Sequence, residues 1–70
     1  MKKEEKCRLL FGTIVKYKFA RDITDETICK RIGISENTFK SKKTNPEKFT
    51  LGEFIEMCDF LGVPKEEREF

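Results

Sequence analysis

The sequence predicts an all-α fold, a compact bundle of four to five helices formed by one domain of 70 residues. Three observations lead to this prediction. The helical period of about 3.6 residues is the only periodic signal among the apolar residues. Glycine and proline are few, at four and two residues. Three segments also begin with one pattern, an apolar residue, then a Ser or Thr cap, then an apolar residue four positions after the cap.

The first helix is expected at about residues 4–19. Apolar side chains at helical spacing form a stripe along one of its faces, and the opposite face is polar and expected in water. The segment "ARDIT" ends the helix. The stripe consists of Cys7, Leu10, Phe11, Ile14 and Val15.

The repeated start pattern places the next helices at about residues 24–32, 35–43 and 50–62. In each start the two apolar residues can form a hydrophobic staple, and Glu53 can complete a capping box with Thr50. The three patterns are Ile23-Thr24-Ile28, Ile34-Ser35-Phe39 and Phe49-Thr50-Phe54.

The last long helix is expected to bury a face, and Pro64 is expected to open a short turn over residues 64–69. Met57 and Phe60 lie beside that face, and with Phe70 they either form an exposed apolar patch for a symmetric homodimer or pack within their own chain. The sequence leaves both alternatives open. The predicted buried face consists of Leu51, Phe54, Ile55, Cys58 and Leu61.

The segment "RIGIS" is expected to form the turn between the second and third helices. Gly33 can adopt the positive φ that ends a helix, Ile34 can point into the core, and Ser35 can cap the next helix. This is the spacing of a helix-turn-helix. A glycine at the end of a helix also occurs in small helical bundles with other functions.

The third helix contains only one large apolar residue, Phe39. At about 100° per residue, the side chains that point away from Phe39 are those of Asn37, Ser41 and Thr44, with Thr38 and Lys40 beside them. Asn pairs well with adenine, Lys with guanine or phosphate, and Glu, here Glu36, with the cytosine amino group. These residue types favour a helix that reads base edges in the major groove of DNA.

The net charge of +2, from 15 basic and 13 acidic residues, does not by itself indicate a nucleic-acid partner. The distribution of charge is more informative. The segment "KSKKTNPEK", residues 40–48, contains four lysines and one glutamate, which gives a local charge of +3. Lysines at the end of a helix in the major groove are well placed to meet phosphates, although such runs are also common on solvated surfaces.

Residues 10–64 resemble the Cro/repressor-like (XRE-type) helix-turn-helix family, especially phage and prophage members with a "TF…K.NP..FTLGE" pattern. The matching pieces are "RIGIS", "TF", "NPEKFTLGEF" and "DFLGVP". The resemblance implies a lambda-repressor-like bundle that binds operator DNA, often as a dimer, and regulates transcription in the cytoplasm of a bacterial or phage-infected cell.

The resemblance also implies roles for particular residues. The residues expected to face bases are Glu36, Asn37, Lys40 and Ser41. Those expected near phosphates are Thr24, Lys42, Lys43, Thr44, Asn45 and Lys48. Asp25 departs from the family, because glutamine is common at this position and a carboxylate is expected to be repelled by DNA. Cys29 replaces the usual alanine where the two helices cross.

The remaining residues argue against several other classes of protein. Cys7, Cys29 and Cys58 are odd in number and no histidine is present, which fits neither a disulfide framework nor a zinc site, so we expect reduced thiols, two of them on apolar helix faces. No catalytic motif, phosphate loop, cofactor motif, exported leader or membrane span is expected. The main alternative to DNA binding is a small adaptor that binds protein, which would suit Asp25 and the small net charge.

Overall fold

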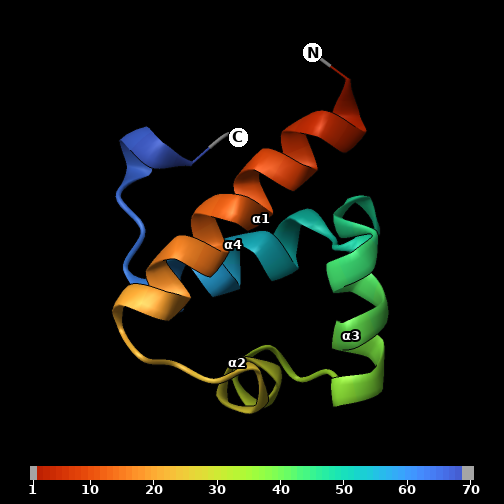
Figure 1. Cartoon of the computed structure of the whole chain (residues 1–70), viewed down its shortest axis with the longest axis vertical. Coiled ribbons are helices and arrows are strands. Elements are labelled where there is room, and N and C mark those ends of the chain that lie inside the picture. The colour runs from red at the N-terminus through yellow and green to blue at the C-terminus, as the bar shows by residue number, and fades with distance from the viewer. Residues whose placement is uncertain (1, 69–70) are drawn as a thin grey trace.

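The computed structural model describes residues 2–68. Apolar residues at helical spacing fold this part of the chain into helices, and it contains no strand. The predicted all-α class is therefore confirmed. In Figure 1, α4 lies behind α1, and α2 and α3 enclose the other side of the core. The elements are α1 (Lys3–Ala20), α2 (Asp25–Ile32), α3 (Glu36–Thr44), the 3-10 turn η1 (Pro46–Lys48), α4 (Leu51–Leu61) and the 3-10 turn η2 (Lys65–Glu67).

The three predicted N-caps are confirmed. In each helix a backbone N–H of the first turn donates to the cap hydroxyl, at 3.2 Å for Thr24, 3.1 Å for Ser35 and 3.1 Å for Thr50. Glu53 also accepts from the backbone N–H of Thr50 at 2.9 Å, which completes the predicted capping box. Each cap satisfies a backbone donor that has no partner within the helix, so local sequence fixes where α2, α3 and α4 begin.

Two glycines end helices in the left-handed conformation, Gly33 after α2 with a φ of 76° and Gly62 after α4 with a φ of 72°. The N–H groups of Gly33 and Ile34 both donate to the carbonyl of Cys29, at 2.9 and 3.1 Å. This bonding satisfies a carbonyl in the last turn of α2 while the chain reverses. The predicted conformation of Gly33 is confirmed.

A group of phenylalanines holds α1, α3 and α4 together. The ring of Phe49 lies 5.4 Å from that of Phe11, 5.7 Å from that of Phe39 and 5.3 Å from that of Phe54, measured between centroids. These separations are typical of favourable aromatic pairs. The buried core consists of Leu10, Ile14, Ile28, Cys29, Phe39, Phe49, Phe54, Met57, Cys58, Leu61 and Val63.

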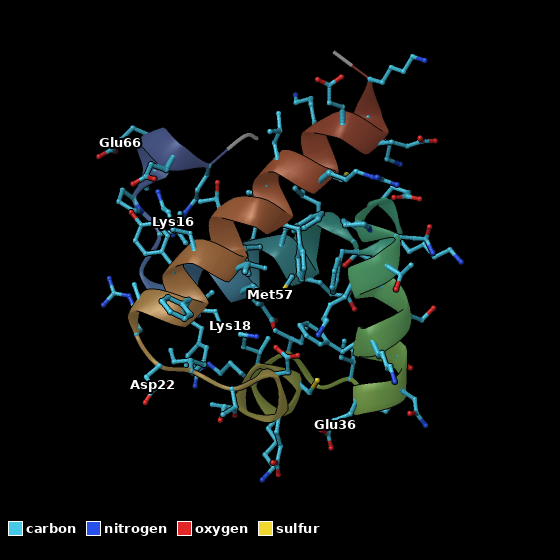
Figure 2. The ribbon with its side chains drawn as sticks, in the orientation of Figure 1. Lys16, Lys18, Asp22, Glu36, Met57 and Glu66 are labelled. Atoms are coloured by element: carbon cyan, nitrogen blue, oxygen red, sulfur yellow. The ribbon has the colours of Figure 1, made fainter. Side chains whose placement is uncertain are left out.

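The buried face of α4 differs from the predicted one. Leu51 and Ile55, which were expected in the core, are 58% and 37% exposed, whereas Met57 is fully buried and lies beneath α1 (Figure 2). Phe54, Cys58 and Leu61 of the predicted face are buried, and Met57 completes the side of α4 that packs against α1 and α2. In α1 the predicted core residue Val15 is likewise 41% exposed.

Met57 is fully buried, which agrees with the alternative that it packs within its own chain and leaves it outside an exposed dimer patch. Phe60 is half-buried, with the guanidinium of Arg31 5.3 Å from its ring centroid. Phe70, the third member of that patch, lies outside the described residues, as does the end of the predicted 64–69 turn. The observed part of that turn is η2, which Pro64 precedes.

The longest helix, α1, has 18 residues and carries η2 against its surface. Lys16 donates to Glu67 at 2.7 Å, and the hydroxyl of Tyr17 donates to the other oxygen of the same carboxylate. Despite its length, α1 is too polar to cross a membrane, and none of the helices described in residues 2–68 has the required length and apolar character.

Candidate nucleic-acid interface

Residues 33–35 join α2 to α3 in a short turn. In Figure 1, α2 is seen end-on while α3 lies in the plane of the picture, so the two axes cross rather than run side by side. Ile34 is half-buried between the helices, and Ser35 caps α3. The turn thus holds α3 at the edge of the molecule, with its first turn projecting beyond the core.

The outward face of α3, which we define as Asn37, Lys40, Ser41 and Thr44, is exposed along its whole length. Phe39 on the opposite side is the only buried residue of this helix and is 2% exposed. Glu36 lies at the end of the helix farthest from α4, where Figure 2 labels it. The structure therefore brings the four predicted base-reading residues, Glu36, Asn37, Lys40 and Ser41, to one accessible end and side of α3.

The predicted phosphate-binding lysines fall into two groups. Lys48 is exposed and forms no ion pair within residues 2–68. The same holds for Lys40, which was predicted to read a base. Lys42 instead lies 2.8 Å from Glu53, and Lys43 lies 2.7 Å from Asp25. The second group is thus already neutralised by carboxylates of α4 and α2.

The other predicted phosphate contacts are also placed. Thr24 is exposed, but its hydroxyl accepts the N–H of Thr27 as the cap of α2. Thr44 is exposed on the outward face of α3, and Asn45 is half-buried where α3 ends and η1 begins. Lys48 lies at the end of η1. Thr44, Asn45 and Lys48 therefore follow one another along the C-terminal end of α3.

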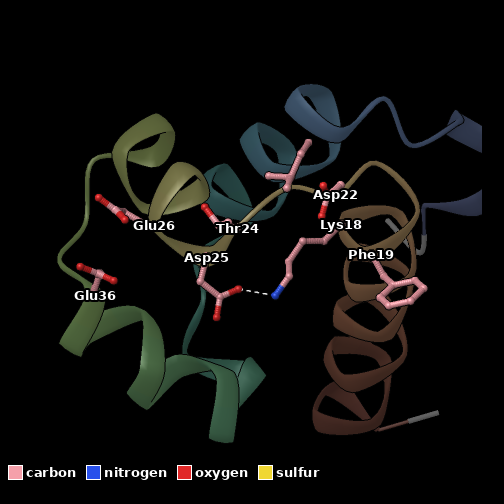
Figure 3. A pocket seen from close by; sticks show the side chains of 8 residues that line it. Lys18, Phe19, Asp22, Thr24, Asp25, Glu26 and Glu36 are labelled. Carbon is pink, nitrogen blue, oxygen red and sulfur yellow. Dashed lines mark hydrogen bonds and ion pairs between the residues drawn. The ribbon is translucent and has the colours of Figure 1, made fainter.

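Asp25 is the first residue of α2 and lies between two lysines. Its Oδ1 is 2.5 Å from Lys18 Nζ and its Oδ2 is 2.7 Å from Lys43 Nζ; Figure 3 shows the first contact as a dashed line. Partial burial acts to raise the pKa of Asp25, but the hydrogen bonds from Lys18 and Lys43 outweigh it, and the pKa lies below its ordinary value. This carboxylate is charged and internally paired.

A small hollow of about 200 Å³ separates α2 from the first half of α3. Asn37 and Lys40 lie along one wall, and Asp25 and Cys29 along the other. The hollow is therefore lined by hydrogen-bond donors, such as the Lys40 ammonium, and by acceptors, such as the Asp25 carboxylate.

A second hollow, of about 680 Å³, lies where the end of α1 meets the starts of α2 and α3 (Figure 3). We call it the acidic hollow; it is lined by Lys18, Phe19, Asp22, Ile23, Thr24, Asp25, Glu26 and Glu36. Phe19 on its rim is 86% exposed. This surface was not predicted from the sequence, although Phe19 gave a signal, because it lies outside the apolar stripe of the first helix.

Neither a protein-family model, nor a curated protein, nor a solved structure matches the chain. Within residues 2–68, no group of three or more His, Cys, Asp or Glu side chains is arranged to hold a metal ion.

Proposed function

We propose that this protein is a Cro/repressor-like regulator of transcription that binds double-stranded DNA sequence-specifically by inserting α3 into the major groove. One observation carries the proposal. α3 buries Phe39 alone and presents an exposed, uninterrupted row of hydrogen-bonding side chains on its other side. A helix that contributes so little to the core has a surface suited to a partner.

The dimensions and side chains of α3 fit base readout. An α-helix with its side chains is about 10–12 Å across, so α3 can enter the major groove, which is about 12 Å wide. In a helix-turn-helix the N-terminal part of the second helix meets the base edges. That part carries Asn37, which can pair with adenine, and Lys40, which can pair with guanine.

The C-terminal end of α3 and η1 fit the flanking phosphates. Lys48 lacks an intramolecular ion pair in the described structure and can replace a counterion on the DNA backbone. Thr44 and Asn45 precede Lys48. The side-chain amide of Asn45 can donate to a phosphate oxygen, and the hydroxyl of Thr44, which donates to the carbonyl of Lys40 at 3.4 Å, can do so after rotation. Phosphate contacts of this kind would fix the register of α3 in the groove.

Selection of bound sites from random duplex DNA tests this function. We expect enrichment of a defined site, with affinity that falls steeply as salt increases. Two half-sites related by a dyad would show that the protein binds as a homodimer, since half-site symmetry mirrors protein symmetry. Recovery of random sequence together with absence of binding to bulk duplex DNA at 50 mM salt would overturn the proposal.

The acidic hollow favours a second candidate function, an adaptor that binds a basic protein surface. Phe19 is 86% exposed on the rim of this hollow, and Asp22, Glu26 and Glu36 give its lining a negative charge, which suits a partner with an apolar side chain among positive charges. Heparin distinguishes the two candidates, because a DNA binder is retained in a salt-dependent manner whereas an adaptor with this acidic surface passes through.

A further inference from the structure

The carboxylate of Asp25 bridges two lysines that come from different helices. Lys18 from α1 meets Oδ1 and Lys43 from α3 meets Oδ2, so both oxygens are used. Lys43 is one of the lysines expected to contact phosphate, and its ammonium lies 5.8 Å from the Phe39 ring centroid, on the side of α3 that meets α2. In this structure a side chain of the protein itself takes the place of that anion.

We propose that Asp25 is an internal competitor for DNA phosphate: it holds Lys43 in a closed ion pair that must open before the lysine can contact DNA, and thereby sets the affinity and the salt dependence of binding. The inference rests on the proposed DNA-binding function and concerns the regulation of the same surface. A carboxylate and a phosphate are both oxygen anions and use the same N–H donors.

The Asp25–Lys43 pair is accessible enough for a DNA phosphate to replace the carboxylate of Asp25 as the partner of Lys43. The Lys43 side chain is 38% exposed and that of Asp25 is 31% exposed, so an incoming phosphate can reach the ammonium group. Asp25 has no structural duty as a helix cap, because the hydroxyl of Thr24 already accepts the N–H of Thr27. Opening the pair therefore leaves the start of α2 capped.

The neighbouring Lys42–Glu53 pair does not meet these conditions. Its two side chains are only 18% and 17% exposed, and Glu53 also accepts the N–H of Thr50 in the capping box of α4. Releasing Lys42 would leave a half-buried carboxylate without its cation, which is costly. We therefore assign the competitor role to Asp25 and not to Glu53.

Two charge-neutralising variants test the proposal on random-sequence duplex DNA. Asp25→Asn removes the competitor. Glu26→Gln is the control, because it removes the same charge one residue along α2. Glu26 lies 3.4 Å from the exposed Lys30 and forms no ion pair with Lys18 or Lys43. One additional phosphate contact steepens the plot of log affinity against log salt by about 0.9 and corresponds to about tenfold tighter binding at 0.1 M salt. We expect this change for Asp25→Asn and an unchanged slope for Glu26→Gln.

Lys43→Ala supplies an independent measurement, which stays informative if Asp25→Asn lowers the melting temperature. The alanine change should cost little affinity in the wild-type background and about tenfold in the Asp25→Asn background, a coupling that a double-mutant cycle measures. Equal slopes for Asp25→Asn, Glu26→Gln and the wild type, or equal costs of Lys43→Ala in both backgrounds, would overturn the competitor role while leaving DNA binding intact. Absence of binding by every form would instead overturn the proposed function.

Discussion

The ammonium group of Lys42 lies 2.8 Å from Glu53, the residue that closes the capping box of α4. The carboxylate of Glu53 therefore accepts from the backbone of α4 and from a side chain of α3 at once. Lys42 also lies 5.8 Å from the ring centroid of Phe49, at the centre of the aromatic group. One lysine thus connects the candidate reading helix to the start of α4 and to the core.

This arrangement changes the expected effect of removing Lys42. Lys42→Ala should destabilise the protein by about 1–2 kcal/mol, between the values for exposed and for buried ion pairs, because it leaves Glu53 without its cation. It should leave the salt slope of DNA binding nearly unchanged. Urea unfolding and binding titrations at several salt concentrations measure the two effects.

Lys48→Ala is the matched control for Lys42→Ala. Lys48 is exposed at the end of η1 and forms no ion pair within residues 2–68, so its removal should leave stability within about 0.5 kcal/mol and flatten the salt slope by about one unit. The opposite distribution of effects between the two lysines would show that Lys42 opens toward DNA.

Acid should weaken the fold through Asp25 and Glu53. Burial acts to raise the pKa of Glu53, but the hydrogen bonds from Lys42 and from the backbone of Thr50 outweigh it and lower the pKa, as the two lysines do for Asp25. A carboxyl whose pKa is lower in the folded state stabilises the fold above its unfolded pKa, about 3.9 for Asp and 4.3 for Glu, and this contribution is lost as pH falls through the folded pKa.

We therefore expect the free energy of unfolding to be insensitive to pH from about 7 to 5 on account of these groups and to fall below about pH 4. Urea unfolding of the wild type and of an Asp25→Asn, Glu53→Gln double variant measures it. The double variant should be less stable at pH 7 and should lose less stability between pH 5 and 3. Parallel curves for the two proteins would show that neither ion pair contributes.

The glycines at the ends of α2 and α4 should not tolerate side chains. Gly33→Val places a β-branched residue at a φ of 76° and should cost more than about 1 kcal/mol in stability. Gly62→Ala adds a Cβ only 3.2 Å from a guanidinium nitrogen of Arg21, in addition to the strain at a φ of 72°. Both should lower the melting temperature.

Gly12 provides a control of opposite sign. It lies within α1, and an added Cβ would meet no atom within 4 Å. Gly12→Ala should therefore raise stability by about 0.5–1 kcal/mol, because alanine loses less backbone freedom than glycine when a helix forms. If all three changes had similar effects, the left-handed turns would not be the reason for glycine at positions 33 and 62.

The features that could be predicted from the sequence are those that a few neighbouring residues determine. Thr24, Ser35 and Thr50 cap helices through bonds three residues away, and Gly33 reverses the chain within one turn. Such contacts are encoded by local residue type and spacing. The bounds of α2, α3 and α4 consequently agree with the predicted ones to within one or two residues.

The errors concern contacts between distant segments. Periodicity alone could not show which side of α4 is buried, because Leu51 and Met57 both lie near its apolar side. Packing against α1 and α2 buries Met57 and leaves Leu51 exposed. The candidate site shows the same limit. Its polar residues were predictable as types, but the pairing of Lys42 with Glu53 and of Lys43 with Asp25 joins residues 11 and 18 positions apart.

The two cysteines in the core should react slowly with thiol reagents. Cys29 is 3% exposed and Cys58 is fully buried, and burial raises the pKa of both thiols, which disfavours the reactive thiolate. Cys7 is half-buried near the start of α1 and should be labelled first. Mass spectrometry of the folded protein after timed labelling should show one fast site. Rapid labelling of Cys29 or Cys58 below the unfolding transition would show that the core opens locally.

The side chains of α3 should differ in what they contribute to DNA binding. Asn37 lies on the exposed face, and the proposed function has it read a base, so Asn37→Ala should lose about 1–3 kcal/mol on the selected site and little on random DNA. Lys48→Ala should weaken binding to both, because a phosphate contact carries no sequence information. Binding of each variant to the selected site and to a shuffled duplex separates these effects.

Phe39→Ala completes the test of α3, because it removes the only buried side chain of the helix without touching the outward face. We expect a loss of about 3–5 kcal/mol in stability, enough to unfold a protein of this size. If Phe39→Ala unfolds the chain while Asn37→Ala and Lys48→Ala leave all DNA binding unchanged, α3 holds the fold together and its polar face serves a different partner. A selective loss of the preferred site in Asn37→Ala, with the melting temperature kept, is the result that only base readout explains.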